Sequence, residues 1–256
     1  MYNSGTKAKR ITMLASYLRA AILSLVLFAG AAFPALADEL ADFNAAVEEA
    51  SAHNRVAIGY LRTGNADLAS LELDRLRAAW GELTKRFAGK RPAVFGGNKL
   101  YVTTLTDVST RLVTADLMLN SGRPDAARQS LEGVRSDLHA LRKSAGIEVL
   151  ADCIFDSNKA AATFMAYDVP ELDWSKPGIA NAVAETATAY AGVLNRCDGM
   201  AGEAVGKNPE FRRLIDDAKS ELAKVAHAIE HHDTSQLHRI DGSLRAIDNL
   251  LAFLFG

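Results

Sequence analysis

Four residues near the C-terminus carry side chains that could bind a metal ion. His227 and His231 lie four positions apart, and His232 and Asp233 follow directly. Histidines at positions i and i+4 of a helix share one face, and imidazole nitrogens and carboxylate oxygens are ligands for divalent transition metals. We therefore consider a surface metal site formed by His227, His231, His232 and Asp233.

The same segment also fits a catalytic pattern. From His227 to His231 it reads His-Ala-Ile-Glu-His, which matches the H-x-x-E-H pattern of zinc peptidases, where Glu230 would activate water. Those enzymes need a large α/β domain and a further acidic ligand well downstream, but only 25 residues follow His231. On a helical wheel both histidines point away from the apolar side. The pattern therefore favours a solvated polar face, and we expect no enzyme activity.

Two acidic residues fall on apolar stripes of predicted helices. Asp116 and Glu72 each lie among leucines at helical spacing. An acid that faces a core either pairs with a cation or a hydrogen-bond donor, or it titrates at a raised pKa and marks a site. We expect both carboxylates to be buried and paired with an inward arginine such as Arg77 or Arg135.

The chain has two cysteines, Cys153 and Cys197, and both lie on apolar stripes of predicted helices. If these helices form a hairpin that turns near residues 168–175, both sulfurs come to similar heights at its far end, at about 1.5 Å per residue. An exported protein meets an oxidising compartment. We predict a Cys153–Cys197 disulfide. Two separate buried thiols are the alternative.

The first 37 residues have the layout of a secretory signal peptide. Residues 1–19 carry only positive charge, residues 20–33 form a charge-free apolar run, and a proline precedes the small-x-small sequence at 35–37. A retained membrane anchor is the alternative, because the charge-free stretch 20–37 has 18 residues. We expect cleavage after Ala37 and a mature chain that is exported, and periplasmic in a bacterium.

The rest of the chain is patterned as amphipathic helices. Apolar residues recur every three or four positions, and no stretch alternates in the manner of a strand. Several helix starts are marked by capping residues, namely Pro124 with Asp125, the sequence Asn208-Pro209-Glu210, and Asp233 with Gln236 three positions on. We predict an all-α fold of eight helices, each roughly 20 residues long.

Eight such helices joined mostly by short turns predict two tandem antiparallel four-helix bundles. We place the N-terminal bundle at 38–145 and the C-terminal bundle, with its disulfide, at 146–256. The alternative is an α-solenoid of helical hairpins, because the turns that begin at Gly64 and Gly122 share the pattern Gly-x-x-Asp-x-Ala and look like those of tetratricopeptide arrays. Their separation of 58 residues does not fit the repeat of about 34 in such arrays.

Exported four-helix bundles often hold haem. The motif Cys-x-x-Cys-His is absent here, since Ile-Phe-Asp follows Cys153 and Asp-Gly-Met follows Cys197. This excludes covalently attached haem. In helix number, helix length and export, the chain resembles the periplasmic cytochrome c′ and cytochrome b562 group. A non-covalent haem would need an inward His or Met as its axial ligand. Met165 lies toward the edge of an apolar stripe, where a methionine more often fills a gap in the core than binds haem.

Charge narrows the possible partners. From Asp38 onward the chain has 25 basic and 31 acidic residues, a net charge of −6. This balance argues against nucleic acid and anionic membranes as partners. We predict an exported, non-enzymatic helical-bundle protein that binds an unknown periplasmic protein or small ligand. The alternative is a metal-handling or haem-related bundle.

Overall fold

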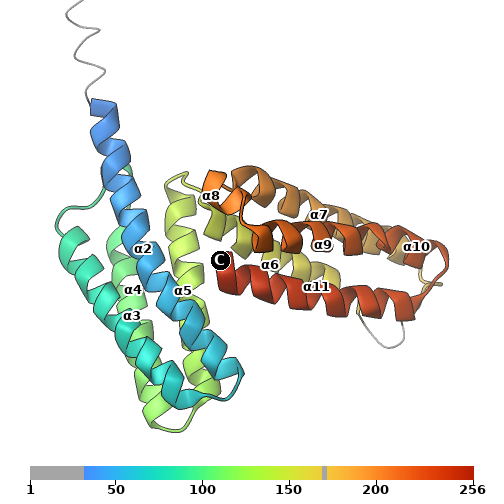
Figure 1. Ribbon diagram of the computed structural model, residues 1–256, viewed down its shortest axis with the longest axis horizontal. Helices are drawn as coiled ribbons and strands as arrows, with labels where there is room; N and C mark the ends of the chain where they lie inside the picture. Colours follow the sequence, from blue (N-terminus) through green and yellow to red (C-terminus); the bar gives the residue numbers. More distant parts are fainter. Residues whose placement is uncertain (1–31, 169–171) are drawn as a thin grey trace, which may run out of the picture.

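Two four-helix bundles make up the described part of the protein (Figure 1). The computed structural model describes residues 32–168 and 172–256, and within these ranges it contains helices and turns but no strand. The predicted all-α bundle fold is therefore confirmed. Most of the predicted signal peptide, residues 1–31, lies outside the described residues.

The first bundle is an antiparallel arrangement in which each helix packs on the next and the last packs back on the first (Figure 1). Its elements are α2 (Ala32–Arg62), α3 (Ala66–Phe87), the short 3-10 helix η1 (Ala93–Phe95), α4 (Leu100–Asn120) and α5 (Pro124–Ser144).

Aromatic side chains close one end of its core. The rings of Phe43 and Phe87 meet edge to face with centroids 5.4 Å apart, and Phe95 from η1 lies at the same distance from Phe43. Tyr101 is fully buried and donates its hydroxyl hydrogen to the Phe87 carbonyl at 3.0 Å. Such edge-to-face pairs add specific geometry to the burial of apolar area, so the loop between α3 and α4 is held against the core.

The second bundle repeats this plan with one interrupted helix. A single residue, Lys224, separates α9 from α10, and the two pieces together occupy one position of the bundle, between α7 and α11. The elements are α6 (Leu150–Met165), α7 (Ile179–Met200), α8 (Glu203–Gly206), α9 (Pro209–Ala223), α10 (Val225–Glu230) and α11 (Thr234–Phe255).

The helix starts follow the sequence signals. The side chain of Asn208 accepts hydrogen bonds from the backbone N–H groups of Glu210 and Phe211 at 2.9 and 3.2 Å. Asp233 accepts one from the N–H of Gln236 at 2.8 Å. These bonds satisfy donors that a helix N-terminus otherwise leaves free. α5 begins at Pro124, which has no N–H to satisfy.

The predicted disulfide is present. Cys153 of α6 and Cys197 of α7 are bonded, with their Cα atoms 5.4 Å apart, and both residues are fully buried. The bond joins the first two helices of the second bundle at the end where α6 begins and α7 finishes. It thereby fixes one end of that helical hairpin.

Each bundle has its own buried core, and the two meet along α2, α5, α6 and α11. Figure 1 shows the C-terminal half of α11 lying beside α2, with the long axes of the two bundles crossing steeply. A short turn, residues 145–149, connects α5 to α6. The relative placement of the bundles therefore depends on contacts between segments that are distant in the sequence.

The helix α2 begins at Ala32, so the predicted cleavage position after Ala37 lies in its first two turns. Cleavage there would shorten α2 at its N-terminal end. Among the described helices, none is long and apolar enough to cross a membrane. Export itself stays a prediction.

Candidate functional site

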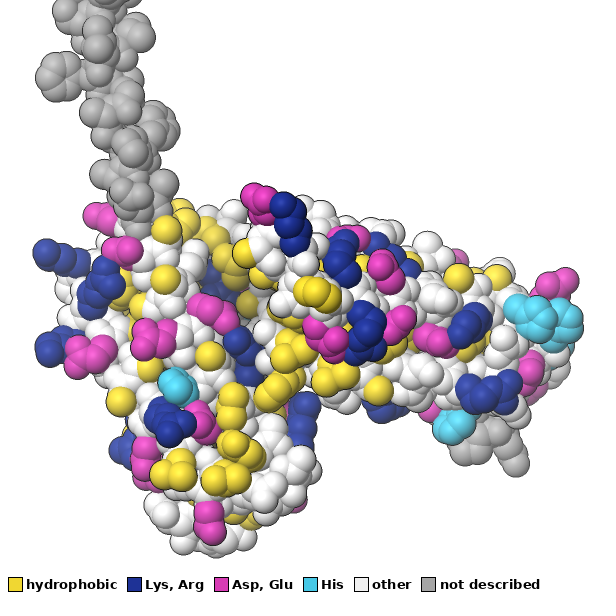
Figure 2. Space-filling model, in the orientation of Figure 1, with side chains coloured by type: hydrophobic (Ala, Val, Ile, Leu, Met, Phe, Trp, Pro, Cys, Tyr) yellow, Lys and Arg dark blue, Asp and Glu magenta, His cyan; other side chains and the backbone are white. Residues whose placement is uncertain are grey.

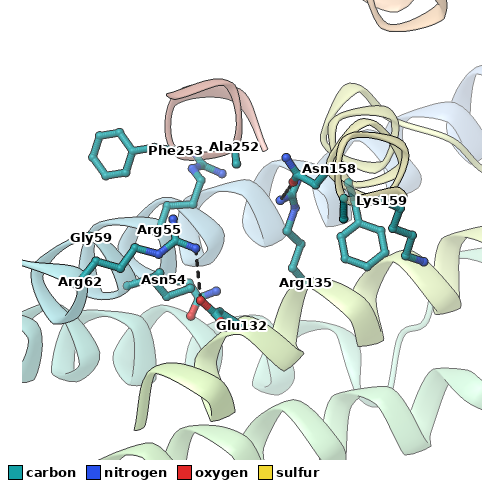
Figure 3. A pocket seen from close by; sticks show the side chains of 13 residues that line it. Asn54, Arg55, Gly59, Arg62, Glu132, Arg135, Asn158, Lys159, Ala252 and Phe253 are labelled. Carbon is teal, nitrogen blue, oxygen red and sulfur yellow. Dashed lines mark hydrogen bonds and ion pairs between the residues drawn. The ribbon is translucent and has the colours of Figure 1, made fainter. Parts of the chain in front are cut away.

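A cavity of about 290 Å³ opens where the two bundles meet (Figure 3). Residues of α2 and α5 form one side, and residues of α6 and α11 form the other. Its apolar wall includes Ile58, Phe155, Ala162 and Phe253. Because the lining comes from both bundles, the cavity, which we call the cleft, exists only when the bundles are docked.

Basic side chains dominate the polar lining of the cleft. Arg55, Arg62, Arg135 and Lys159 line it, and Glu132 is the one acidic residue among the lining residues. This excess contrasts with the net negative charge of the chain. A concave, partly buried site with an excess of positive charge has a positive electrostatic potential, which favours anions.

Two of the four cations are already paired. Arg62 donates to Glu132 of α5 and to Asn249 of α11, both at 3.2 Å. Arg55 donates to Glu48 and to the carbonyl oxygen of Gly256, both at 2.6 Å. The contacts with Glu132, Asn249 and Gly256 join α2 to α5 and to the C-terminal end of the chain. They also reduce the capacity of both guanidinium groups to take another anion.

Arg135 is differently placed, because it extends from α5 into the other bundle. Its Nη1 donates to Asn158 Oδ1 at 2.5 Å (Figure 3). Its Nη2 donates to the Ala151 carbonyl at 3.4 Å. In the described part of the chain no carboxylate forms an ion pair with it, and its Nε is buried without a hydrogen-bond partner. Burial lowers the pKa of Arg135 to about 10, and the charge of Asp248 opposes that effect.

Phe155 contacts both of the cations that lack a carboxylate partner among the described residues. The Arg135 guanidinium carbon lies 5.3 Å from the centroid of its ring and the Lys159 ammonium nitrogen lies 4.3 Å from it. Cations are attracted to the face of an aromatic ring, so these contacts position both charges at the cleft. Lys159, like Arg135, forms no ion pair with a carboxylate among the residues that the structure describes.

Asn54 adds an acceptor to the wall. It is buried, and its Nδ2 donates to the Leu131 carbonyl at 3.2 Å, which fixes the orientation of the amide. Its Oδ1 is buried without a partner. Buried polar atoms are nearly always hydrogen-bonded, so the cleft region holds unused donors and acceptors.

The predicted metal ligands lie elsewhere, at the tip of the second bundle, where histidine side chains are visible in Figure 2. The rings of His227 and His231 stack with centroids 4.1 Å apart. The Nδ1 atoms are engaged, that of His227 with Gln236 Oε1 at 2.9 Å and that of His231 with the His227 carbonyl at 3.0 Å. The structure therefore brings these two histidines together.

The other two predicted ligands turn to different partners. The His232 ring stacks on Trp174, with centroids 5.6 Å apart, and the Asp233 carboxylate caps α11. No cluster of three or more His, Cys, Asp or Glu side chains suited to a metal occurs within residues 32–168 and 172–256. Met165, the candidate haem ligand, packs partly buried against the second core. Metal or haem binding stays the alternative to the predicted binding role.

Glu72 is buried, as predicted, but its partners differ from the predicted arginines. Its Oε2 lies 2.7 Å from His53 Nδ1, and its Oε1 accepts from Arg75 at 2.5 Å. Both partners lie on the exposed side of the α2–α3 pair. The carboxylate is thus paired at the edge of the core.

Asp116 pairs with Arg77 at 3.4 Å, as predicted, but the expectation that it is buried is wrong, because its side chain is 31% exposed. The buried stripe of α4 passes through Leu112 and Ala115. Each residue turns the helix by about 100°, so one step beyond Ala115 places Asp116 at the rim of the core.

Compared with models of protein families, with curated proteins and with solved structures, the chain matches none. The fold and the site define a helical protein of two bundles with a cationic cleft between them.

The cleft was not predicted from the sequence. Arg135 follows the buried Val134 on α5 and was assigned to its own bundle, whereas it reaches the other one. One signal was available on α6, where Phe155, Asn158, Lys159 and Ala162 recur at helical spacing beside the buried stripe. A second stripe of apolar and polar residues on a helix that already packs in a core indicates that the helix also contacts another part of the protein.

Proposed function

We propose that this protein is an exported, non-enzymatic binding protein that takes a small organic anion into the cleft between its two bundles. The observation that carries the proposal is the pair Arg135 and Lys159, two cations without a carboxylate partner among the described residues, at the face of Phe155 in an apolar-walled cavity.

The electrostatics of Arg135 support an anionic ligand. Removing a guanidinium from water is unfavourable unless an anion or several hydrogen bonds compensate for it. Asn158 and Ala151 supply two acceptors, but the Nε of Arg135 has none. A carboxylate, sulfonate or phosphate group can accept two parallel hydrogen bonds from a guanidinium.

The walls of the cleft indicate the rest of the ligand. Small-molecule sites are concave, mostly apolar and often lie between domains, with volumes of about 300–1,000 Å³. The cleft, at about 290 Å³, lies at the lower end of that range. Ile58, Phe155 and Phe253 offer apolar contact. We infer an anion with a compact apolar or aromatic part.

The position of the cleft supports binding as its role. A ligand held between α2 and α5 on one side and α6 and α11 on the other would contact both bundles at once. It would therefore stabilise their docked arrangement by its binding free energy. An export pathway to an oxidising compartment agrees with the buried disulfide.

Binding of anilinonaphthalene sulfonate, an aromatic anion whose fluorescence rises on binding, tests the proposal. We expect saturable binding to the mature chain, weakened at least about tenfold in Lys159→Gln and Arg135→Gln, as expected for the loss of one charge-assisted hydrogen bond. Lys159 is exposed, so its substitution leaves the fold intact.

Lys85→Gln is the matched control, because it removes one exposed positive charge from α3, far from the cleft. This variant should bind the probe as the wild type does. Equal weakening in all three variants would show a diffuse charge effect and would overturn the proposal. So would affinities that are independent of Lys159 and Arg135.

A further inference from the structure

A second hollow continues the cleft outward along α6 and α11. It has a volume of about 410 Å³, and Asn158 and Ala162 line both cavities. Along α6 the lining advances from Phe155 in the cleft to Ala166 in the hollow. Eleven residues of helix span about 16 Å. The two hollows therefore adjoin at Asn158 and Ala162 between α6 and α11, and together we call them the groove, which starts at the wall made by α2 and α5.

Asp248 of α11 lines this second hollow. Its Oδ1 is buried without a hydrogen bond of normal geometry, whereas its Oδ2 is not buried and accepts no hydrogen bond from the described residues. Tyr190 of α7 and Ser157 of α6 lie beside it and are fully buried, and their hydroxyl oxygens also have no partner of normal geometry. These buried groups act on one another, because the Tyr190 hydroxyl and the Asn158 amide both lower the pKa of Asp248, so the atom of Asp248 that a ligand in the hollow can reach is Oδ2.

Asn158 connects this acceptor to the cation of the cleft. Its Oδ1 accepts from Arg135, so its Nδ2 is the atom that faces Asp248 and helps the carboxylate stay ionised. Arg135 and Asp248 thus lie on either side of one amide group. A ligand that reaches both needs its acidic group and its hydrogen-bond donor close together.

We propose that the anion bound in the cleft is a hydroxy acid or a similar molecule, whose acidic group faces Arg135 and whose neighbouring neutral donor binds Asp248. This inference rests on the proposed function and names the class of ligand for the same groove. Arg245 also lines the groove but pairs with Asp241 at 2.8 Å, which leaves Arg135 and Lys159 as two cations without a carboxylate partner against Asp248 among the described lining residues, so we take the donor to be neutral. An ammonium group would meet net repulsion there.

The titration of Asp248 agrees with a neutral donor. Burial raises the pKa of this carboxyl group, against the opposing effects of Asn158, Arg135 and Tyr190. The charged groups around it are Arg135 from α5 and Arg245 from its own helix, while α6 and α7 contribute the neutral Asn158, Ser157 and Tyr190. Its surroundings therefore favour the uncharged form of this group more than water does.

Three related acids test the inference by calorimetry or NMR titration. Phenylpropanoate and phenyllactate differ by one hydroxyl group, and phenylalanine carries an ammonium group at that position. We expect phenyllactate to bind roughly five- to tenfold more tightly than phenylpropanoate, the value of one hydrogen bond. Phenylalanine should bind more weakly than phenyllactate, because it has no net charge.

Two variants assign the preference to Asp248. Asp248→Leu removes the acceptor and should bring the ratio of the phenyllactate and phenylpropanoate affinities to about one. Asp248→Asn keeps a carbonyl oxygen of the same shape and should preserve most of the ratio. Because the ratio compares two monoanions, the change in charge near Arg135 cancels. The wild-type ratio alone tests the inference if Asp248→Leu does not fold.

The outcomes separate this inference from the proposed function. A wild-type ratio of one, tighter binding of phenylalanine, or no saturable binding of phenyllactate would each overturn the hydroxy-acid inference. In any of these cases the anion site itself stands if anilinonaphthalene sulfonate still binds in a manner that depends on Arg135 and Lys159. If that probe also fails, both proposals fail.

Discussion

Arg142 of α5 and Asp152 of α6 form a two-pronged ion pair in the turn that joins the two bundles. The Nε and Nη2 atoms of Arg142 each donate to one oxygen of Asp152 at 2.7 Å, and the side chains are only 6% and 4% exposed. Asp152 also accepts from the Val149 N–H at 3.2 Å. A planar pair of this kind fixes direction as well as distance, so it sets the path of α6 away from α5.

Breaking this pair from one side should destabilise the protein strongly. Asp152→Asn or Arg142→Met leaves one buried group without its counter-charge, and we expect a loss of about 3–5 kcal/mol in the free energy of unfolding. Urea denaturation followed by circular dichroism measures it. The double variant Arg142→Met, Asp152→Leu should lose much less, because no lone charge is then buried. Single variants no less stable than the double would contradict this account.

The disulfide should contribute substantially to the stability of the second bundle. Cys153 and Cys197 are 44 positions apart, and closing a loop of that size stabilises a fold by at most about 4 kcal/mol on entropic grounds. We expect Cys153→Ser, Cys197→Ser to lower the denaturation midpoint. Reduction should lower the midpoint of the wild type and leave that of the double variant unchanged. A reductant effect on the variant would point to another cause.

His139 should make stability fall as the solution becomes mildly acidic. Burial lowers its pKa below the ordinary value of 6.5, and the opposing charges of Asp152 and Asp156 do not offset this. Protonation is therefore less favourable in the folded chain than in the unfolded one, so the stability that His139 contributes is present above pH 6.5 and is lost as the pH falls through its lowered pKa.

The denaturation midpoints of wild type and His139→Gln, measured from pH 6.5 down through the lowered pKa of His139, test this pH dependence. The decline should be shallower in the variant. His231→Gln is the control, because that histidine is exposed at the far end of the second bundle and its Nδ1 contacts the His227 carbonyl and no carboxylate among the described residues. Parallel pH profiles of wild type and His139→Gln would refute this role for His139.

The contribution of Asp248 to stability should depend on pH in the opposite direction to that of His139. The pKa of Asp248 is raised in the folded chain, chiefly by burial, so the stability linked to its protonation is fully present below the ordinary value of 3.8 and is lost as the pH rises through the raised pKa. We therefore expect Asp248→Asn to be more stable than wild type at neutral pH and equally stable at about pH 3. Thermal unfolding at both pH values tests this prediction. A wild type that is more stable than Asp248→Asn at neutral pH would contradict it.

Filling the groove should block binding without any change of charge. Ala162 is exposed and lines both hollows, so Ala162→Trp places an indole ring at their junction. We expect the affinity for anilinonaphthalene sulfonate to fall at least about tenfold, as for the loss of most apolar contact in a small site. Thr163→Trp, one position along α6 and outside the lining, should bind normally. Unchanged binding in Ala162→Trp would place the probe elsewhere.

Much of the fold is determined locally and could be predicted. The periodicity of apolar residues produces amphipathic helices, and Asn208 and Asp233 begin helices because their side chains accept hydrogen bonds from residues two or three positions on. The disulfide followed from the same reasoning, since two helices of known length in a hairpin bring Cys153 and Cys197 to one level. These features depend on short stretches of chain.

Side-chain partners were harder to predict. The sequence placed Glu72 on a core-facing stripe, but whether its carboxylate met an arginine of α3 or of α5 depended on how far each helix rotates in the bundle. It meets His53 and Arg75. For Asp116 an error of one residue in the stripe changed a buried acid into a half-exposed one.

The cleft was decided by tertiary structure alone. Arg62 meets Asn249 across 187 positions of sequence, and Arg135 meets Asn158 across a bundle boundary. Periodicity reports which face of a helix is apolar, but it carries no information about which of the remaining faces a second bundle covers. That choice depends on the buried pair of Arg142 and Asp152 and on the docking of α11 against α2, which bring four distant helices around one cavity.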